Sequence, residues 1–315
     1  MARRKKAVPW EVAEGPSAGR RAAKAVLLLL AVGAAAAGLA YGFFRLGALV
    51  QGHPEYLVRR SDLVIVRMPA WIPPDARAEL DIARLDPALP EVFSLLDPAL
   101  CKRLAACYAR SVWVERVERI VKSDPRADPR RRLLVHLRFR RPLAFVSRPD
   151  GFVLVDDQAV RLPGLHREPR LPGAGPDGGD LDLLVITGVG SSPPAPGLVW
   201  PEPGLQAGLR IVDGLHARRE RLHLRTVDVS NVGRRRDPLA SEVLLYTAHD
   251  TEIRWGRAPT PQAARLQEPT VAQKADYLDY VYQSVGHVDG VLEYVDIPNE
   301  AVRRRSSPTA YRLRS

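Results

Sequence analysis

The chain has 315 residues, of which 46% are hydrophobic, with 47 Lys and Arg against 36 Asp and Glu, a formal net charge of +11 and two Cys. This composition excludes a collagen-like chain, disorder over the whole length and a small protein held together by disulfides. The length favours two compact domains with tails. The excess of positive charge raises the question of nucleic-acid binding, and the answer depends on where the basic residues lie.

The N-terminal region combines a basic arm with a long apolar segment. Residues 1–24 hold seven Lys and Arg against two Glu, a net charge of +5, whereas residues 25–44 hold no charge. Twenty helical residues span about 30 Å, the thickness of the hydrocarbon core of a bilayer. The sequence therefore predicts a cytoplasmic arm, a transmembrane helix over 25–44 and a linker over 45–57. The alternative is a cleavable signal peptide, whose apolar core is usually about 7 to 15 residues long.

The charges around the apolar segment also predict its orientation. Basic residues are dense before the segment, and only Arg45 follows it directly, so the positive-inside rule places the N-terminus in the cytoplasm. Residues 45–315 then lie outside and carry 40 basic and 34 acidic residues, a net charge of +6 over 271 residues. These charges are interspersed, which is typical of a solvated surface, and nucleic acid is not an expected partner.

An α+β unit is predicted over residues 58–141. Two later segments rich in β-branched or alternating apolar residues should form a hairpin, because a polar stretch at 124–132 separates them. Asp97 and Pro98 are expected to act as N-cap and first residue of a helix. The resulting order is β-α-α-β-β. The elements are a strand at 63–66, a weak helix that follows residues 72–75 and runs through Leu85, a helix whose first residue is Pro98, and strands at 112–121 and 133–140.

The helix after Pro98 carries both cysteines. Cys101 and Cys107 are six residues apart, which places them about 120° apart around a helix and outside disulfide geometry. Leu100, Leu104, Cys107 and Tyr108 recur at helical spacing, so this face should be buried. We expect two partly buried thiols and no disulfide.

A second, β-rich unit is predicted over residues 142–304. Residues 163–204 hold nine Pro and nine Gly and should be a mostly irregular, mobile loop region. Thr270 and Gln273 fit a capping box at the start of a late helix. A disordered tail is expected over 305–315. The predicted elements are strands at 152–155, 160–162, 183–187, 222–230, 243–247, 252–255 and 292–297, the last of these being the final strand, and a helix at 205–215.

Residues with catalytic potential are scattered. None of the seven His has metal-ligand spacing, and His136 and His223 are expected to face solvent from strands. Asp156 and Asp157 are adjacent, so their side chains point apart in a strand, and a turn role is expected. Tyr residues at 277, 280, 282 and 294 fit core and helix packing. We assign no catalytic, metal or cofactor residue and expect a protein that is not an enzyme.

Several segments match a known family pattern in their order and spacing. They are 111–120, 133–137, Arg140–Ala144, 151–156 with 162–163, 184–188, 252–256, Lys274 with Leu278, and Tyr294–Ile297. Together they resemble the FtsQ/DivIB family of bacterial cell division proteins, and the resemblance covers roughly residues 20–305. The chain departs from the family pattern after the first strand, where residues 66–69 lack the usual Val-x-Gly, in long segments at 124–132 and 163–183, and at Pro298.

The resemblance implies a POTRA domain at 58–141, a β domain at 142–304, and no catalysis. It implies a protein of the bacterial inner membrane and division septum that holds the bitopic partners FtsB and FtsL and helps to regulate septal peptidoglycan synthesis. In the family, a partner strand adds to the edge that follows the last Asp-containing strand. The corresponding residues here are Asn299, Glu300, Ala301, Val302, Arg303 and Arg304.

Other interpretations remain open at this point. The edge after Asp296 could be a solvated surface protected by its own Arg residues, and Pro298 donates no N–H for strand pairing. POTRA units also occur in proteins that handle outer-membrane proteins. A membrane-tethered hydrolase is the third alternative, and it predicts a pocket where His and carboxylate side chains converge.

Overall fold

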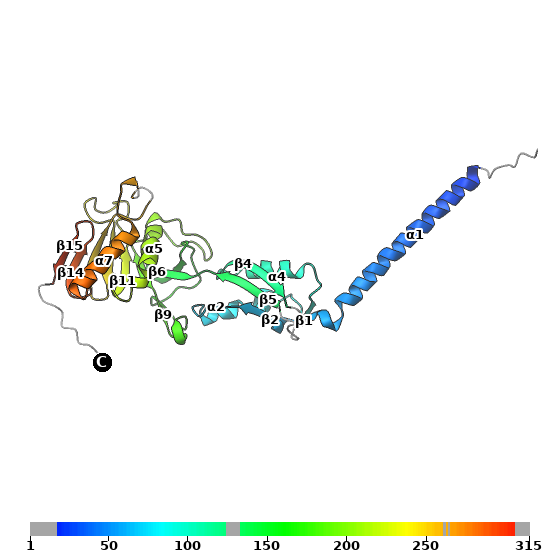
Figure 1. Ribbon diagram of the computed structural model, residues 1–315, viewed down its shortest axis with the longest axis horizontal. Helices are drawn as coiled ribbons and strands as arrows, with labels where there is room; N and C mark the ends of the chain where they lie inside the picture. Colours follow the sequence, from blue (N-terminus) through cyan, green and yellow to red (C-terminus); the bar gives the residue numbers. More distant parts are fainter. Residues whose placement is uncertain (1–17, 124–132, 261–262, 264, 306–315) are drawn as a thin grey trace, which may run out of the picture. The chain divides into compact units, whose positions relative to one another are not determined.

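The computed structural model describes residues 18–123, 133–260, 263 and 265–305. The chain divides into two compact units. One contains the chain up to Arg59 together with Glu91–Pro98, and the other contains Arg60–Pro90 and the chain from Ala99 onward. The architecture is mixed α and β, with an N-terminal helix followed by sheet-rich parts, as the sequence predicts (Figure 1).

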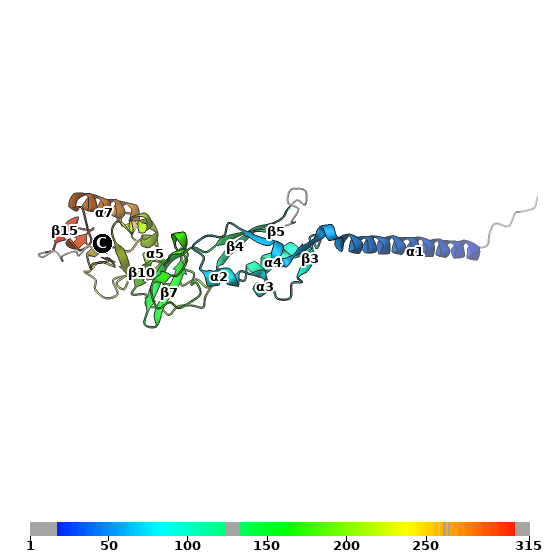
Figure 2. The ribbon, with the colours of Figure 1, turned by 90° about the horizontal axis from the view of Figure 1, so that it is seen from below.

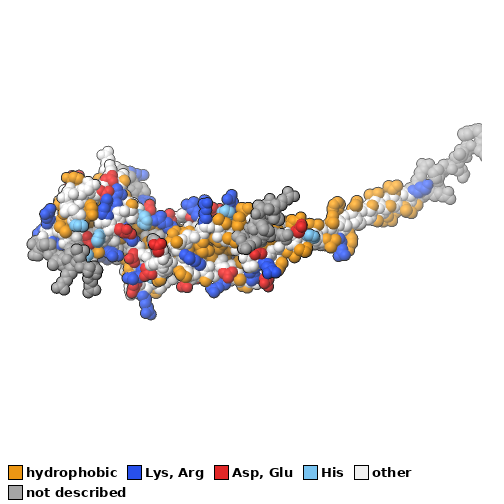
Figure 3. Space-filling model, turned by 60° about the horizontal axis from the view of Figure 1, so that its bottom comes forward, with side chains coloured by type: hydrophobic (Ala, Val, Ile, Leu, Met, Phe, Trp, Pro, Cys, Tyr) orange, Lys and Arg blue, Asp and Glu red, His pale blue; other side chains and the backbone are white. Residues whose placement is uncertain are grey.

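The first unit contains a helix that is long and apolar enough to cross a membrane. Helix α1 (Ala18–Gln51) includes a 29-residue stretch, Ala23–Gln51, with a mean hydropathy of 2.1. It extends beyond the predicted 25–44 at both ends, and hydrophobic side chains line it in Figure 3. Signal sequences near an N-terminus can share these properties. The same unit contains the 3-10 helix η1 (Pro54–Tyr56) and an antiparallel pair of strands, β1 (Leu57–Arg59) and β3 (Val92–Ser94).

The second unit opens with a three-stranded sheet. The sheet order is β2-β5-β4, in which β5 runs parallel to β2 and antiparallel to β4. The predicted strands and the hairpin are confirmed, and the predicted polar turn at 124–132 lies outside the described residues. The elements are η2 (Arg60–Asp62), β2 (Leu63–Val66), α2 (Pro74–Glu79), α3 (Ile82–Leu85), α4 (Leu100–Tyr108), β4 (Val114–Lys122) and β5 (Leu133–Phe139).

Two helix predictions in this region are wrong in detail. The single helix expected to run through Leu85 is two helices, because the Asp81 carboxylate accepts a hydrogen bond from Ala83 N at 3.0 Å and caps a new start. Helix α4 begins two residues later than expected. Its N-cap is Ala99, which offers no side-chain acceptor, and not the predicted Asp97.

The buried face of α4 is confirmed. Leu100, Leu104, Cys107 and Tyr108 are all buried, and burial raises the pKa of Tyr108 to about 12. Both thiols are free, with Cys101 half-buried and Cys107 buried. The helix therefore packs on one face, and its cysteines stay apart as their spacing predicts.

The rest of the second unit is built on an eight-stranded sheet of order β15-β14-β13-β12-β11-β10-β6-β7. Strand β6 was not expected, because it starts with a Pro and follows β5 almost directly. The elements are β6 (Pro142–Arg148), β7 (Gly151–Asp156), β8 (Arg170–Leu171), η3 (Pro176–Gly178), β9 (Leu181–Asp182), β10 (Leu184–Thr187), α5 (Pro203–Leu215), η4 (His216–Arg218), β11 (Leu224–Asp228), β12 (Val243–Thr247), β13 (Glu252–Gly256), α7 (Val271–Val285), β14 (Leu292–Asp296) and β15 (Ala301–Arg304).

Two helices cover one face of this sheet. Helix α5 joins the parallel neighbours β10 and β11, and α7 joins the parallel neighbours β13 and β14. Both helices lie on the same side of the sheet in Figures 1 and 2. The core between the helices and the sheet includes Trp200 and Trp255, which are each 1% exposed.

The Pro- and Gly-rich region at 163–204 is mostly irregular, as predicted, but side chains tie it to the sheet. It contains the short hairpin β8–β9 and strand β10. The Arg148 guanidinium donates to the carbonyl of Ser191 at 3.2 Å, and that of Arg161 donates to the carbonyl of Pro194 at 2.6 Å. These contacts fix loop segments that we expected to be mobile.

Asp156 has the turn role that the sequence predicts. Its Oδ1 accepts hydrogen bonds from Gln158 N at 2.9 Å and Val160 N at 2.7 Å, and its Oδ2 accepts one from Arg140 at 3.1 Å. Burial raises the pKa of Asp156, which is 1% exposed, and these hydrogen bonds act against that rise. The carboxylate therefore shapes the chain after β7.

Helix α7 begins with the expected capping box and carries a buried lysine. Thr270 Oγ1 accepts from Gln273 N at 3.2 Å, and Gln273 Oε1 accepts from Thr270 N at 2.8 Å. Lys274 is 2% exposed, and its ammonium donates to Trp255 O at 2.9 Å and to Glu268 Oε1 at 2.8 Å. This amine therefore joins the first turn of α7 to the end of β13.

Replacing the buried amine should destabilise the fold. Lys274→Met keeps most of the side-chain volume but leaves the Trp255 carbonyl and the Glu268 carboxylate without their donor, and we expect a loss of about 2 kcal/mol in the free energy of unfolding. Denaturant unfolding measures this loss. Gln283→Met, at an exposed position of the same helix, should change the value by less than about 0.5 kcal/mol. Equal losses in the two variants would contradict the role given to Lys274.

Candidate functional site

The eight-stranded sheet has two edge strands, and they differ in how far they are covered. On β7, Phe152 and Val155 form bridges with His166 and Arg161 from the following loop. Strand β15 pairs with β14 alone, and no strand or bridge of the described residues lies on its other side. An unpaired strand presents a row of backbone N–H and C=O groups. The open end of this sheet is therefore β15.

The prediction that 292–297 is the final strand is wrong, because the chain reverses after Asp296. The Asp296 carboxylate accepts hydrogen bonds from Asn299 N at 3.1 Å and Asn299 Nδ2 at 3.0 Å. Glu300 takes a left-handed φ of 49°, which completes the reversal. Pro298 lies in this turn, where its missing N–H interrupts no ladder. Pro298 was expected to weaken strand pairing because it donates no N–H, but it lies in the turn and not in a strand.

The six residues predicted to bind a partner fall in this turn and in β15. Asn299 and Glu300 belong to the turn, and the other four form the strand. Val302 pairs with the buried Val295 and so lies on the core-facing side of the sheet, yet it is 45% exposed because it is at the edge. The edge therefore combines open backbone groups with an accessible apolar side chain.

Charged and aromatic groups border the edge strand. The Arg303 guanidinium lies 3.0 Å from the Glu293 carboxylate, in an exposed ion pair. On α7, burial raises the pKa of Tyr277, and the negative charges of Glu300 and Asp296 raise it further. Burial and these negative charges therefore keep the Tyr277 hydroxyl protonated.

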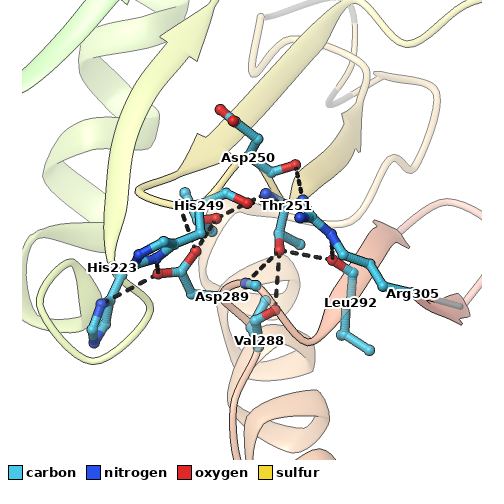
Figure 4. A network of polar contacts seen from close by, with 10 residues as sticks. His223, His249, Asp250, Thr251, Val288, Asp289, Leu292 and Arg305 are labelled. Atoms are coloured by element: carbon cyan, nitrogen blue, oxygen red, sulfur yellow. Dashed lines mark hydrogen bonds and ion pairs between the residues drawn. The ribbon is translucent and has the colours of Figure 1, made fainter. Parts of the chain in front are cut away.

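A buried carboxylate organises the loops behind the edge (Figure 4). Asp289, in the loop between α7 and β14, has a side chain that is 6% exposed. Its Oδ1 accepts hydrogen bonds from Thr247 Oγ1 at 2.5 Å and His249 N at 2.8 Å. Its Oδ2 lies 2.6 Å from His249 Nδ1 and 3.3 Å from His223 Nδ1. We call these four residues the Asp289 cluster.

The structure corrects the prediction for His223. This residue precedes β11 in a turn, with a left-handed φ of 52°, and does not belong to the strand expected at 222–230. Its side chain is 54% exposed, so access to solvent is confirmed, but its Nδ1 faces Asp289. His136 lies on β5 as expected and is half-buried. Sequence spacing gave no signal for the Asp289 cluster, because its members come from the end of β12, the turn that follows it, and two other connections of the chain.

The environment of Asp289 favours its charged form. Burial alone would raise the pKa of this carboxyl, but the hydrogen bonds from Thr247 and His249 outweigh burial and lower the pKa. Asp289 is therefore an anion at neutral pH, held by donors from the end of β12 and the turn that follows it.

Arg305 links this turn to the edge strand. Its guanidinium donates to the carbonyls of His249 and Asp250, each at 2.8 Å, and to the carbonyl of Leu292 at 3.3 Å. Its backbone N–H donates to Val291 O at 3.1 Å. Arg305 was expected to open the disordered tail, but it is anchored by these contacts, and the remainder of that tail, 306–315, lies outside the described residues.

The Asp289 cluster brings His and carboxylate together, as the hydrolase alternative predicts, but the hydroxyl groups point elsewhere. A Ser- or Thr-type nucleophile passes its proton to an imidazole. Thr247 donates to Asp289 itself, and Thr251 donates to Leu292 O at 2.8 Å. Both threonines are buried. The contacts are those of a cluster that fixes a turn.

Within the described ranges, no group of His, Cys, Asp and Glu could hold a metal ion. The sequence matches no protein-family model and no curated protein. The resemblance to FtsQ/DivIB, and the partner role of the edge that it implies, therefore remain predictions.

The low pKa of Asp289 predicts how stability varies with pH. A folded-state pKa below the unfolded value, about 3.9, means that the carboxylate stabilises the fold fully above that value and that this stabilisation is lost as pH falls through the folded-state pKa. Asp289→Asn should therefore lower the free energy of unfolding by about 2 kcal/mol at pH 7 and by much less at pH 2.5, as measured by denaturant unfolding.

The control for this measurement is Asp250→Asn. The Asp250 side chain is exposed, and the residue contributes its backbone carbonyl to Arg305. This variant should match the wild type within about 0.5 kcal/mol at both pH values. A deficit in Asp289→Asn that is the same at pH 7 and pH 2.5 would count against an ionised Asp289.

Proposed function

We propose that this protein is a single-pass membrane scaffold of the bacterial division machinery, resembling the FtsQ/DivIB family. One observation carries the proposal: strand β15, the open edge of the sheet, coincides with the residues that the resemblance marks as the partner edge. The long apolar helix and the mixed α and β architecture behind it also support the proposal.

In this proposal, α1 is an uncleaved anchor in the inner membrane. Its 29-residue apolar stretch is about 44 Å long as a helix, more than the roughly 30 Å of the hydrocarbon core, so it can span a bilayer with tilt. The basic residues that precede the stretch place the N-terminus in the cytoplasm by the positive-inside rule. The chain after α1 then lies outside the cytoplasm, at the division septum.

The region at 58–141 is proposed to be a POTRA domain. The order of its strands and helices, and a three-stranded sheet whose central strand is the last in sequence, are compatible with this assignment. A POTRA domain alone would suit envelope protein handling equally well. The open edge at β15 favours the division scaffold, because it offers a strand-addition site in the region 142–304.

The edge is suited to an extended partner. Backbone groups of β15 can pair with an added strand, and the accessible Val302 side chain can contact an apolar residue of that strand. Arg303 and Arg304 are exposed and favour acidic neighbours. We propose that small bitopic division proteins of the FtsB and FtsL type bind here, and that the complex helps to regulate septal peptidoglycan synthesis without catalysis by this chain.

Charge on the edge strand should weaken partner binding without unfolding the protein. Val302→Glu places a carboxylate where an apolar contact is expected, and Arg303→Glu reverses a charge. Each should reduce co-purification of an FtsB-like partner about tenfold or more, a loss of about 1.4 kcal/mol or more. The matched control is Arg225→Glu on β11, which is exposed and distant from the edge in the sheet order. Undiminished partner recovery with both edge variants would exclude β15 as the binding edge.

A fluorescent fusion to the full chain tests the cellular role. The fusion should form a band at the septum of dividing cells, because a scaffold of this type acts where septal wall is made. A matched fusion carries Val302→Glu, which should leave membrane localisation intact, since α1 is unchanged. Uniform membrane fluorescence of the wild-type fusion, with no septal band, would contradict the division role.

A further inference from the structure

Strand β15 needs stabilising contacts in addition to its backbone hydrogen bonds with β14. It has four residues, three of which are exposed, and it pairs on one side only. Its pairing with β14 also has a register irregularity between Leu292 and Tyr294. Short, exposed strands with few contacts open most easily. A partner strand can add to β15 only while β15 itself remains paired with β14.

The two ends of β15 are held by different contacts. At the start, the turn is closed by the hydrogen bonds between Asp296 and Asn299. At the end, Arg305 donates to backbone carbonyls of two separate segments, Leu292 on β14 and His249 and Asp250 in the turn after β12. The second set of contacts fastens the end of the edge strand to a loop that is not part of its ladder.

The loop that receives Arg305 is itself fixed by the Asp289 cluster. The Asp289 carboxylate accepts a hydrogen bond from the backbone N–H of His249 and also contacts the ring of His249. The next residue, Asp250, has a left-handed backbone conformation with a φ of 59°. The carbonyl of His249 thus belongs to the residue that the buried carboxylate holds (Figure 4). Two directed acceptors, each at 2.8 Å from the same Nη2, require the loop to keep this geometry.

We infer that Arg305 is a positioning residue that transmits the order imposed by Asp289 on the turn after β12 to the exposed strand β15. The buried Asp289 carboxylate fixes the conformation of the turn after β12. The carbonyls of this turn fix the position of the Arg305 guanidinium, and the guanidinium in turn holds the end of β15 against β14. This inference deepens the proposed function, on which it rests, by naming residues that keep the partner edge paired without belonging to it.

Hydrogen exchange of the full chain in detergent micelles tests the last of these steps, from Arg305 to β15, without any partner. Arg305→Met removes the donors and keeps the length of the side chain, and it should speed exchange of the β15 amides that bond to β14 about tenfold or more, with β12 and β13 unchanged. Arg304→Met, one residue earlier, should leave exchange in β15 within about twofold of the wild type. Unchanged β15 exchange in Arg305→Met, or an equal rise in Arg304→Met, would overturn the inference.

A double-variant comparison tests the link to the buried carboxylate. Asp289→Asn should also speed β15 exchange, but should add little when Arg305 is already Met, because both changes break the same relay. If Asp289→Asn does not fold, His249→Ala replaces it, since this change removes the 2.6 Å contact to the ring and keeps the backbone bond. If the increase in the β15 exchange rate in the double variant equals the product of the increases in the two single variants, Asp289 and Arg305 act separately.

The same variants separate this inference from the proposed function. If Arg305→Met speeds β15 exchange and lowers recovery of an FtsB-like partner, both stand. If exchange in β15 rises while partner recovery is unchanged, the relay stands and the partner edge lies elsewhere. If exchange in β15 does not change, the relay is wrong whatever the partner does.

Discussion

The need to bury one face of an eight-stranded sheet determines most of the second unit. Strands β11 and β13 run in the same direction, because each is antiparallel to β12. The crossovers through α5 and α7 therefore advance along the sheet in the same sense, and right-handed connections must place both helices on the same face. After α7 the chain forms β14, one side of which is already paired with β13. The next strand can therefore pair with β14 only on its other side, at the edge of the sheet. Strand β15 is thus an edge as a consequence of the topology.

The same topology explains why polar groups gather behind the edge. The turn after β12 and the loop before β14 meet at the same end of the sheet, because β12 runs antiparallel to β13 and β13 runs parallel to β14. Each loop has backbone groups that the ladders leave unpaired, and burying them requires partners. The Asp289 carboxylate accepts from the backbone N–H of His249 in the turn after β12, and Arg305 donates to the carbonyls of His249 and Asp250 in the same turn. A buried anion and a nearby cation thus satisfy backbone groups of loops that the helices do not cover.

Much of the second unit could be predicted from sequence where the pattern is local. The capping box at Thr270 and Gln273, the strand at 243–247 and the buried face of α4 depend on residues within one or two turns of each other. Strand β15 escaped prediction because Arg303 and Arg304 carry no apolar alternation, since an edge strand has little to bury. Lys274 was placed on α7, but its burial depends on acceptors at Trp255 and Glu268 that no helical period reveals.

The candidate site was predictable only in part, for a related reason. The six residues at 299–304 came from a resemblance, whereas His223, His249 and Asp289 are brought together by loops of three different connections and have no common spacing. The left-handed backbone conformations of His223 and Asp250 determine the direction that these loops take. Such conformations are uncommon for residues other than glycine. The local pattern predicted the strands, and their order in the sheet decided which loops would meet.

The three consecutive arginines at the end of β15 have different environments, and this bears on what the edge can recognise. Arg303 pairs with Glu293 in an exposed ion pair, and Arg305 is engaged with carbonyls. In the described part of the chain, the Arg304 side chain has no such partner. Exposed ion pairs contribute about 1 kcal/mol or less, so under the proposed function the charge on this edge would select a partner but would not supply most of the affinity. Backbone pairing along β15 and contact with Val302 would have to supply it, and both depend on keeping β15 paired with β14.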